Sequence, residues 1–258
     1  MMKLRSAPVL EFAIPAALLA LWWFASQQST SFYFPALRDI LAVLVDKWLG
    51  HRFVDDLLPS VARLLAGFFM ATVLGVTIGV ALGLSRTAAA FCSAVLDFLR
   101  SMPSVALIPF AILVFGIDTS MKVFVITFGA LWPILLNTID GVRGTDKQML
   151  EMAYSFRLSG RETLLRVILP AASPQIFAGL RASLSISLIM MVVSEMLASS
   201  DGIGFAILQA QRSFATKEMW AGLFVLGALG YILNLVFGLV EGRIMRWHRG
   251  LRMTGMTT

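Results

Sequence analysis

The chain has 258 residues, of which 58% are hydrophobic and 14% are charged, with a formal net charge of +6 at pH 7. A soluble globular domain carries about 25% charged residues, so this composition excludes an ordinary soluble protein. The single cysteine excludes an internal disulfide and a cysteine-based metal cluster, and the two histidines stand too far apart in the sequence to indicate a site.

Long uncharged runs recur along the chain, and a helix crosses a bilayer with about 20 mostly apolar residues. The runs lack the alternation and turn spacing of a membrane β-barrel, and a helix satisfies its own backbone groups in lipid. The sequence therefore predicts an all-α integral membrane protein with one transmembrane domain over residues 1–258. We expect six spans, at about 9–27, 61–84, 94–116, 121–141, 173–198 and 219–242.

The first predicted span follows a basic N-terminus and also fits a secretory signal with a cleavage point near Ala25 and Ser26. Glu11 interrupts the start of the apolar run, and removal of this segment would leave five spans. We favour an uncleaved first helix, and cleavage stays open.

The charged residues sort by loop. Lys and Arg predominate on the side that carries both termini and the loop after the fourth span, whereas acidic residues roughly cancel the basic ones on the other side. By the positive-inside rule the basic side is cytoplasmic, so both termini are expected in the cytoplasm. The same sorting explains the net positive charge without a nucleic-acid partner.

The segment from Thr145 to Pro170 is charged and helix-forming, and it lies between apolar runs, so it must lie in water. It contains two spacings typical of capping boxes, Thr145 with Gln148 and Ser159 with Glu162. A capping box supplies partners to amide groups at a helix start. These spacings predict two short helices, at about 146–157 and 160–169, with a turn at Leu158–Ser159.

Apolar side chains on the first of these helices include Ala153 and Tyr154. Ala153 is small enough for close approach, and Tyr154 can bury its ring while its hydroxyl stays wet. This face either packs on the protein's own helix ends or forms a docking surface, and the residues alone do not separate the two interpretations.

The same segment resembles the EAA loop of ATP-binding-cassette importer permeases, whose pattern is E-A-A-x3-G-x9-I-x-L-P. It reads Glu151-Met152-Ala153, then Arg157 at the glycine position, then Val167-Ile168-Leu169-Pro170. In that family the loop is a coupling helix that docks in a groove of the cytoplasmic ATPase. Because the family glycine opens the turn, we expect the Ser159 capping box, with Gly160 behind it, to supply the break here. The resemblance implies these ATPase-coupling residues: Glu151, Met152, Ala153, Tyr154, Arg157, Ser159 and Gly160.

Three further segments resemble the nitrate, sulfonate and taurine branch of these permeases. They are the proline-containing segment 98–117, Trp132–Thr138 with Gly141-Val142, and Ser194–Leu197 with Gly202–Gly204. The likeness covers about 55 to 247 and implies the type I importer permease fold. It also implies a homodimer in the bacterial cytoplasmic (inner) membrane, with two cytoplasmic ATPase subunits and an external substrate-binding protein.

Charged and kinked positions within the spans are functional candidates, because a charge in hydrocarbon is costly. Asp97 and Arg100 lie three positions apart, so they share a helix face and can pair. Arg181 is expected near the cytoplasmic end of its span, where it can snorkel. Each candidate also has a structural interpretation, such as core filling or a hydrogen bond. The candidate translocation path comprises Pro103, Asn137, Met190 and Glu195.

The second span carries small-xxx-small spacing, which permits close helix packing. The glycines that give this spacing are Gly67, Gly75, Gly79 and Gly83.

No G-x-x-x-x-G-K-[ST] loop occurs, so we expect this chain to bind no ATP and no cofactor, and no nucleophile–base pattern indicates an enzyme. By the resemblance, ATP and Mg belong on the partner ATPase subunits. We therefore expect the permease subunit of an ATP-driven importer that works by alternating access. Its expected solute is a small anionic organic molecule such as an alkanesulfonate or taurine, or nitrate. The alternative is a secondary, ion-coupled transporter, which needs broken helices and ion-coupling groups near the midplane.

Overall fold

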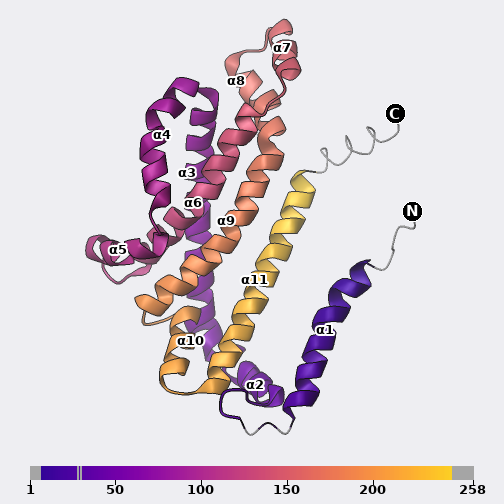
Figure 1. Cartoon of the computed structure of the whole chain (residues 1–258), viewed down its shortest axis with the longest axis vertical. Coiled ribbons are helices and arrows are strands. Elements are labelled where there is room, and N and C mark those ends of the chain that lie inside the picture. Colours follow the sequence, from indigo (N-terminus) through magenta and orange to yellow (C-terminus); the bar gives the residue numbers. More distant parts are fainter. Residues whose placement is uncertain (1–6, 28, 30, 246–258) are drawn as a thin grey trace.

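The computed structural model describes residues 7–27, 29 and 31–245, and this part of the chain is built from helices without strands. Its long helices run side by side, and α7 projects at one end (Figure 1). Within the described residues, 4 continuous helices are long and apolar enough to cross a membrane, and a bent pair adds a fifth candidate span.

The helices follow in this order. The first part comprises α1 (Ala7–Ser26), α2 (Leu37–Val43), π-helical turns at Leu44–Trp48 and Phe53–Leu57, α3 (Leu58–Leu84) and α4 (Arg86–Ser101). Next come a 3-10 turn at Ser104–Leu107, α5 (Ile108–Phe115), α6 (Thr119–Arg143), α7 (Lys147–Ser155) and α8 (Gly160–Thr163). The last part comprises a π-helical turn at Leu164–Ile168, α9 (Leu169–Leu197), α10 (Ile203–Arg212) and α11 (Thr216–Ile244).

The bounds of helices α1, α3, α6, α9 and α11 lie within a few residues of five of the predicted ranges. Among the described residues, α3, α6, α9 and α11 are the ones that belong to the continuous helices long and apolar enough to cross a membrane. The start of α1 and the end of α11 both point toward the end of the molecule that carries α7 (Figure 1). This direction is the one expected if the termini and the segment between α6 and α9 share one side of the membrane.

The third predicted span, at about 94–116, falls on a bent pair of helices, α4 and α5. Helix α4 already begins at Arg86, where the Ser85 side chain accepts a hydrogen bond from the Ala88 N–H at 3.1 Å. The helix breaks at Met102–Pro103, and the two halves meet at 86°. Pro103 explains the break, because proline has no N–H to donate and disfavours the helical conformation of the residue before it.

Helices α3 and α6 pack with their backbones very close together. A Cβ atom added at any of the four spaced α3 glycines would stand 2.5–2.8 Å from a β-branched side chain on α6. Both sets of residues advance along the chain in the same steps, so the two helices run parallel. The small-xxx-small packing predicted from the sequence is therefore confirmed. The pairs are Gly67–Ile126, Gly75–Ile134, Gly79–Thr138 and Gly83–Val142.

Helix α9 lies against α6 in the opposite direction. A Cβ at Gly179 would stand 2.7 Å from the Pro133 carbonyl oxygen, and a Cβ at Gly141 would stand 3.0 Å from the Ala172 carbonyl oxygen. Gly179 on α9 thus fits against the proline-containing part of α6. The central frame of the molecule is the three-helix set α3, α6 and α9.

Helices α1 and α11 lie outside this frame. Trp22 of α1 packs on Trp220 and Phe224 of α11 at ring-centroid distances of 5.2 and 5.6 Å. From that contact the two helices diverge toward the end that carries α7 (Figure 1). Farther along α11, Glu241 forms an ion pair with Arg181 of α9, which ties the outer helix to the frame.

Replacement of Gly79 with alanine tests the close packing of α3 on α6. The added methyl would meet Thr138 Cβ at 2.6 Å and the Leu135 carbonyl oxygen at 3.0 Å, so the helices must separate. We expect Gly79→Ala to cost about 1–3 kcal/mol of stability and to lower the midpoint of thermal unfolding in detergent. Gly227→Ala on α11 is the matched control, because nothing lies within 4 Å of its added Cβ. The close-packing interpretation is wrong if both variants unfold at the same temperature as the parent.

Candidate functional site

Helix α7 begins where Asp146 caps it. The Asp146 side chain accepts a hydrogen bond from the Gln148 N–H at 2.9 Å. The predicted cap at Thr145 is therefore wrong, because the Thr145 hydroxyl donates instead to the Val142 carbonyl at 3.0 Å. Thr145 thus closes the end of α6, and the next residue starts α7. The residue that caps the helix, Asp146, therefore lies one position after the predicted one, Thr145.

Helix α7 ends at a residue in the left-handed backbone conformation. Arg157 has φ 52° and stands at the glycine position of the EAA pattern. The Leu158 N–H donates to the Ala153 carbonyl at 3.0 Å, and the Arg157 N–H donates to the Tyr154 carbonyl at 2.9 Å. These two bonds define a Schellman cap, in which glycine is the usual left-handed residue. The expectation that Ser159 supplies the break is corrected, because Arg157 itself makes the turn.

The Ser159 capping box is confirmed. The Ser159 Oγ accepts from the Glu162 N–H at 3.3 Å, and Glu162 Oε2 accepts from the Ser159 N–H at 3.0 Å. The helix that follows is not the short separate helix predicted at 160–169. It continues through α8, the π-helical turn at Leu164–Ile168 and α9 as one helical run, Gly160–Leu197, so Pro170 lies inside this run.

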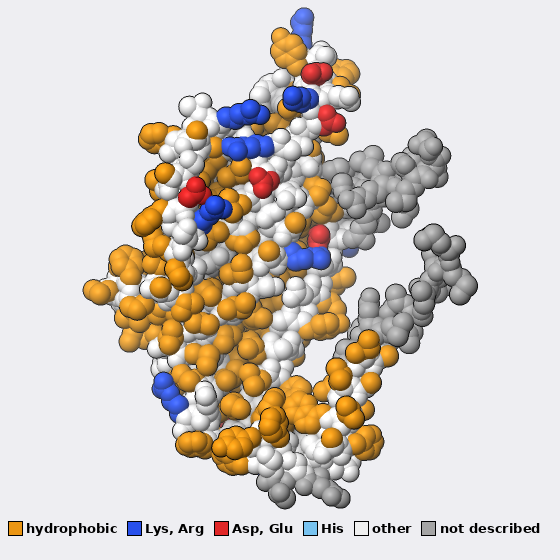
Figure 2. Space-filling view, viewed as in Figure 1, with side chains coloured by type: hydrophobic (Ala, Val, Ile, Leu, Met, Phe, Trp, Pro, Cys, Tyr) orange, Lys and Arg blue, Asp and Glu red, His pale blue; other side chains and the backbone are white. Residues whose placement is uncertain are grey.

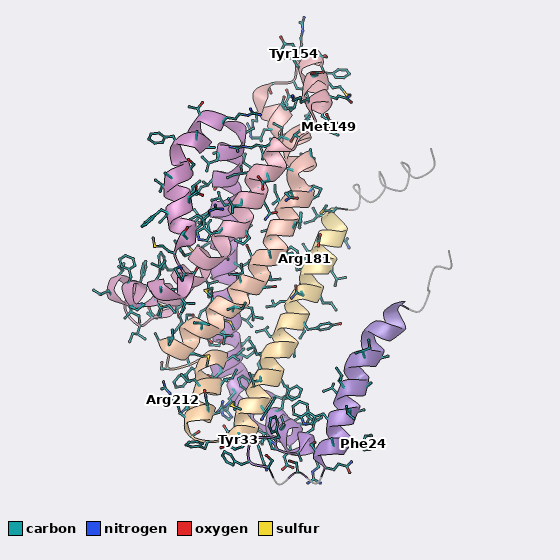
Figure 3. All side chains as sticks on the ribbon, in the orientation of Figure 1. Phe24, Tyr33, Met149, Tyr154, Arg181 and Arg212 are labelled. Atoms are coloured by element: carbon teal, nitrogen blue, oxygen red, sulfur yellow. The ribbon has the colours of Figure 1, made fainter. Side chains whose placement is uncertain are left out.

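The tip formed by α7 presents apolar side chains on its outer surface. Met152, Tyr154 and Phe156 are exposed at 59%, 86% and 75%, and Tyr154 stands at the far end of the molecule in Figure 3. Ala153 points the other way and is buried at 4% exposure. Ala153 therefore packs on the protein itself. Met152 and Phe156, four positions apart, line a groove beside Ala153, whereas Tyr154 lies on another side of the helix. We use the name α7 face for the exposed apolar side chains at this tip, Met152, Tyr154 and Phe156, taken together.

Behind Ala153 lies a mostly apolar groove between α7 and the start of α9. Its volume is about 340 Å³, and Met149, Leu158 and Pro170 are among its lining residues. The other predicted coupling residues of this segment, Glu151, Ser159 and Gly160, are exposed. The α7 tip thus combines an apolar surface with a concave apolar floor.

A second polar cluster lies near the opposite end of the frame, around Glu195 of α9. Its carboxylate is fully buried and accepts from Ser60 Oγ at 2.8 and 2.9 Å, from Arg63 Nη1 at 3.0 Å and from the Gly204 N–H at 3.1 Å. Arg63 also donates to Asp201 at 2.5 Å. This cluster, which we call the Glu195 network, joins α3, the end of α9 and the start of α10.

Two cations of this region are buried. Arg63 is 6% exposed on α3, and Lys122 is 3% exposed on α6 with its ammonium 4.0 Å from Asp201. Arg63 comes one helical turn after Ser60, and both contact Glu195. That spacing is the sequence signal that could have indicated a buried partner for the acid.

Glycines let the α9–α10 loop close over Glu195. Gly202 has φ 106°, and a Cβ there would stand 2.5 Å from the Glu195 side chain. A Cβ at Gly204 would stand 2.5 Å from the Val192 carbonyl oxygen. The Gly202 N–H also donates to Asp56 at 2.8 Å. Gly202 and Gly204 therefore let the backbone pass directly over the buried Glu195 carboxylate.

A surface ion pair lies beyond this network, between α2 and α11. Lys217 donates to Asp39 at 2.8 Å, and this hydrogen bond with its accompanying charge lowers the pKa of Asp39.

The candidate path residues do not gather at one place. Asn137 donates to the Pro133 carbonyl at 2.8 Å and accepts from Gln175 at 2.9 Å, so it bridges α6 and α9. Met190 is buried at 8% exposure and fills the space left by Gly129 on α6. Glu195 lies in the network described above, and Pro103 stands exposed at the α4–α5 bend.

Comparison with known proteins identifies the family. The family described as "Binding-protein-dependent transport system inner membrane component" matches residues 65–247, so the chain belongs to this family of importer permeases. A putative aliphatic sulfonates transport permease protein of Escherichia coli is 32% identical over 247 residues, which is 95% of this chain and 93% of that protein. The taurine transport system permease protein of Escherichia coli is 28% identical over 240 residues, covering 90% and 87%.

A nitrate import permease protein of Leptolyngbya laminosa is 31% identical over 186 residues, covering 72% of this chain and 67% of that protein. Among solved structures, an inward-facing form of the MetNI methionine ABC transporter matches with a TM-score of 0.63 at 18% identity. The match covers 80% of this chain and 97% of that one and confirms the type I permease fold.

Arg157 tests the left-handed end of α7. A residue with a branched Cβ is strained at φ 52°, whereas glycine is not. We expect Arg157→Val to weaken the local structure by about 1–2 kcal/mol and to speed hydrogen exchange of the Leu158 amide. Arg157→Gly is the matched control and should keep or increase the protection of that amide. Equal exchange in the two variants would show that the turn does not depend on this conformation.

Glu195→Ala tests whether the Glu195 network is structural. Removal of one member of a buried ion pair leaves an uncompensated charge on Arg63, so we expect a loss of about 3–5 kcal/mol in stability. The double variant Arg63→Leu with Glu195→Leu should unfold closer to the parent, because neither charge remains buried alone. Thermal unfolding in detergent measures both. A Glu195→Ala protein that unfolds like the parent but no longer transports would instead assign this residue to the path.

Proposed function

We propose that this chain is the membrane subunit of an ATP-driven importer for a small anionic solute, an aliphatic sulfonate or taurine, or nitrate. Membership of the family and the printed activities of its relatives support this solute class. The chain itself holds neither ATP nor a cofactor. ATP and Mg are bound by two cytoplasmic ATPase subunits, and a second copy of the chain completes the transport path.

The observation that carries the proposal is the α7 face. It exposes three large apolar side chains at the tip of the molecule, at the end that lies farthest from the Glu195 network. Aromatic and Met side chains are enriched where proteins bind one another. A tip of this composition, connected to α6 on one side and to the α8–α9 run on the other, suits a docking helix for a soluble ATPase. The start of α1 and the end of α11 point toward that end, which is the cytoplasmic side in this proposal (Figure 1).

An external substrate-binding protein docks at the opposite end. A cleft of about 550 Å³ lies there between the start of α2 and the α10–α11 turn, and Asp39, Phe214 and Lys217 are among its lining residues. Exposed charges beside apolar side chains suit a partner that associates and dissociates in each cycle.

In this proposal, the path opens alternately to each side of the membrane through movement of the α3, α6 and α9 frame. Movement of α7 displaces α6 and α9 together, because Asn137 and Gln175 join them beside the Pro133 position. Pro103 and Asn137 are the path candidates with accessible surface. Met190 and Glu195 are buried, and their role is to stabilise the helices that line the path.

Tyr154→Ala tests the docking role of the α7 face. Loss of a Tyr at the centre of an interface weakens binding about tenfold or more, so the cognate ATPase should no longer co-purify. Uptake of labelled taurine, ethanesulfonate or nitrate into vesicles that contain ATP should fall with it. Tyr231→Ala is the matched control, because Tyr231 is also exposed, at 58%, but on α11.

The alternative, a secondary transporter, predicts a different result. Uptake that proceeds without any ATPase and stops when the proton gradient is dissipated would overturn the proposal.

A further inference from the structure

Four charged side chains gather where the start of α6 meets α3 and the connection from α9 to α10. Arg63 and Lys122 are the cations, and Glu195 and Asp201 are the anions. Each cation stands one helical turn before the first close glycine contact between α3 and α6, so the packing of these two helices brings both cations to the same carboxylate, that of Asp201. The four charges balance only when Asp201 is counted.

Lys122 has the poorest partner in this group. Its side chain is 4% exposed, and none of the hydrogen bonds among the described residues includes its ammonium. Asp201 Oδ1 stands 4.0 Å away, which is beyond hydrogen-bond distance. Lys122 also lies near the start of α6, where the helix dipole disfavours a cation. A buried ammonium has three donors to satisfy, so an additional oxygen acceptor at this position would stabilise it.

Asp201 is the member of the group that water reaches. Its side chain is 37% exposed, whereas those of Arg63 and Glu195 are 7% and 0% exposed. On the face shown in Figure 2, apolar side chains predominate over the half of the molecule opposite α7, and few Lys or Arg side chains lie at the surface there. An anion that approaches this end therefore meets the two buried cations at the position that the Asp201 carboxylate occupies.

We propose that Arg63 and Lys122 form an anion site on the external side, in which the anionic group of the solute takes the place of the Asp201 carboxylate. The Arg63 Nη2 that donates to Asp201 donates to one oxygen of a sulfonate group or of nitrate, and the Lys122 ammonium donates to a second oxygen. Glu195 stays bound to Arg63 Nη1. The inference rests on the proposed function, which supplies a small anionic solute.

Charge balance favours this exchange. A sulfonate group and nitrate each carry one negative charge, as does the carboxylate that they replace, so the buried charges still sum to zero. Asp201 belongs to the connection between α9 and α10 and is already partly exposed, so its carboxylate regains full hydration when it leaves. The cost of uncovering the two cations is offset by the arriving oxyanion.

Asp201→Asn removes the competing charge without a large change in side-chain size. The variant leaves the buried cations in excess, so we expect its midpoint of thermal unfolding in detergent to fall below that of the parent. Sodium nitrate or sodium ethanesulfonate should restore the midpoint in a saturable way, because a ligand that binds only the folded state stabilises it. The oxyanion with the lower half-saturating concentration indicates the solute class that the site prefers.

Sodium gluconate at the same ionic strength controls for salt screening, because its polyol chain is too bulky for a position vacated by one carboxylate. A midpoint of Asp201→Asn that responds equally to all three salts, or to none of them, overturns the proposal.

Two further variants are matched controls. Lys122→Met combined with Asp201→Asn removes one charge of each sign, so this protein should fold and show no response to either oxyanion. Asp39→Asn also leaves a lysine without its carboxylate, but that lysine, Lys217, is 52% exposed and therefore hydrated. Its midpoint should not depend on the oxyanion. A response in either control as large as that of Asp201→Asn alone places the binding elsewhere and contradicts the site.

The site and the proposed function fail separately. Restoration of the midpoint needs neither ATP nor a partner, so a purified permease that shows it but imports without any ATPase keeps the anion site and rejects the proposed function. ATP-driven import of these anions by the parent, together with an Asp201→Asn variant that no oxyanion stabilises, keeps the proposed function and rejects the anion site.

Discussion

The rest of the structure depends on the close approach of α3 to α6. Glycines on one helix meet β-branched side chains on the other, so the two backbones stand nearer than ordinary side chains allow. In lipid, helices gain little from hydrophobic burial, and association relies on such packing and on hydrogen bonds between helices. Thr127 adds one of these bonds by donating to the Gly67 carbonyl at 3.2 Å. This contact fixes the positions of both ends of the molecule relative to each other.

The Glu195 network uses that fixed frame. A buried carboxylate and guanidinium are costly to remove from water, and the cost is offset only when every remaining polar group has a partner. Here Ser60 and Arg63 come from α3, whose position α6 sets, and the Gly204 amide comes from the start of α10. The network therefore forms only when α3, α9 and α10 keep their relative positions, and it constrains the frame at this end of the molecule.

The other end is built differently, since α7 is a short helix held by caps and by one buried alanine. Its connection to the frame is direct, because the helical run that starts at Gly160 continues to Leu197. One end of this run carries the α7 tip and the other end carries Glu195. In the proposed function, a displacement at the tip is transmitted along this run to the network. The π-helical turn at Leu164–Ile168 and the internal Pro174 are the places where the run can bend.

The sequence by itself determined the membrane class, five of the long helices, the Ser159 cap and the glycine packing of α3. These features follow from local composition and from spacing along one helix, which need no knowledge of neighbours. Only the tertiary structure decided that Arg157 makes the turn, that Ala153 faces inward and that Arg63 and Lys122 are buried. The physical reason is that a backbone angle at a helix end, and the side to which a side chain turns, depend on contacts between segments far apart in the chain. Arg63 and Glu195 illustrate this, because no periodicity links residues on α3 and α9 until the glycine-packed frame brings them together.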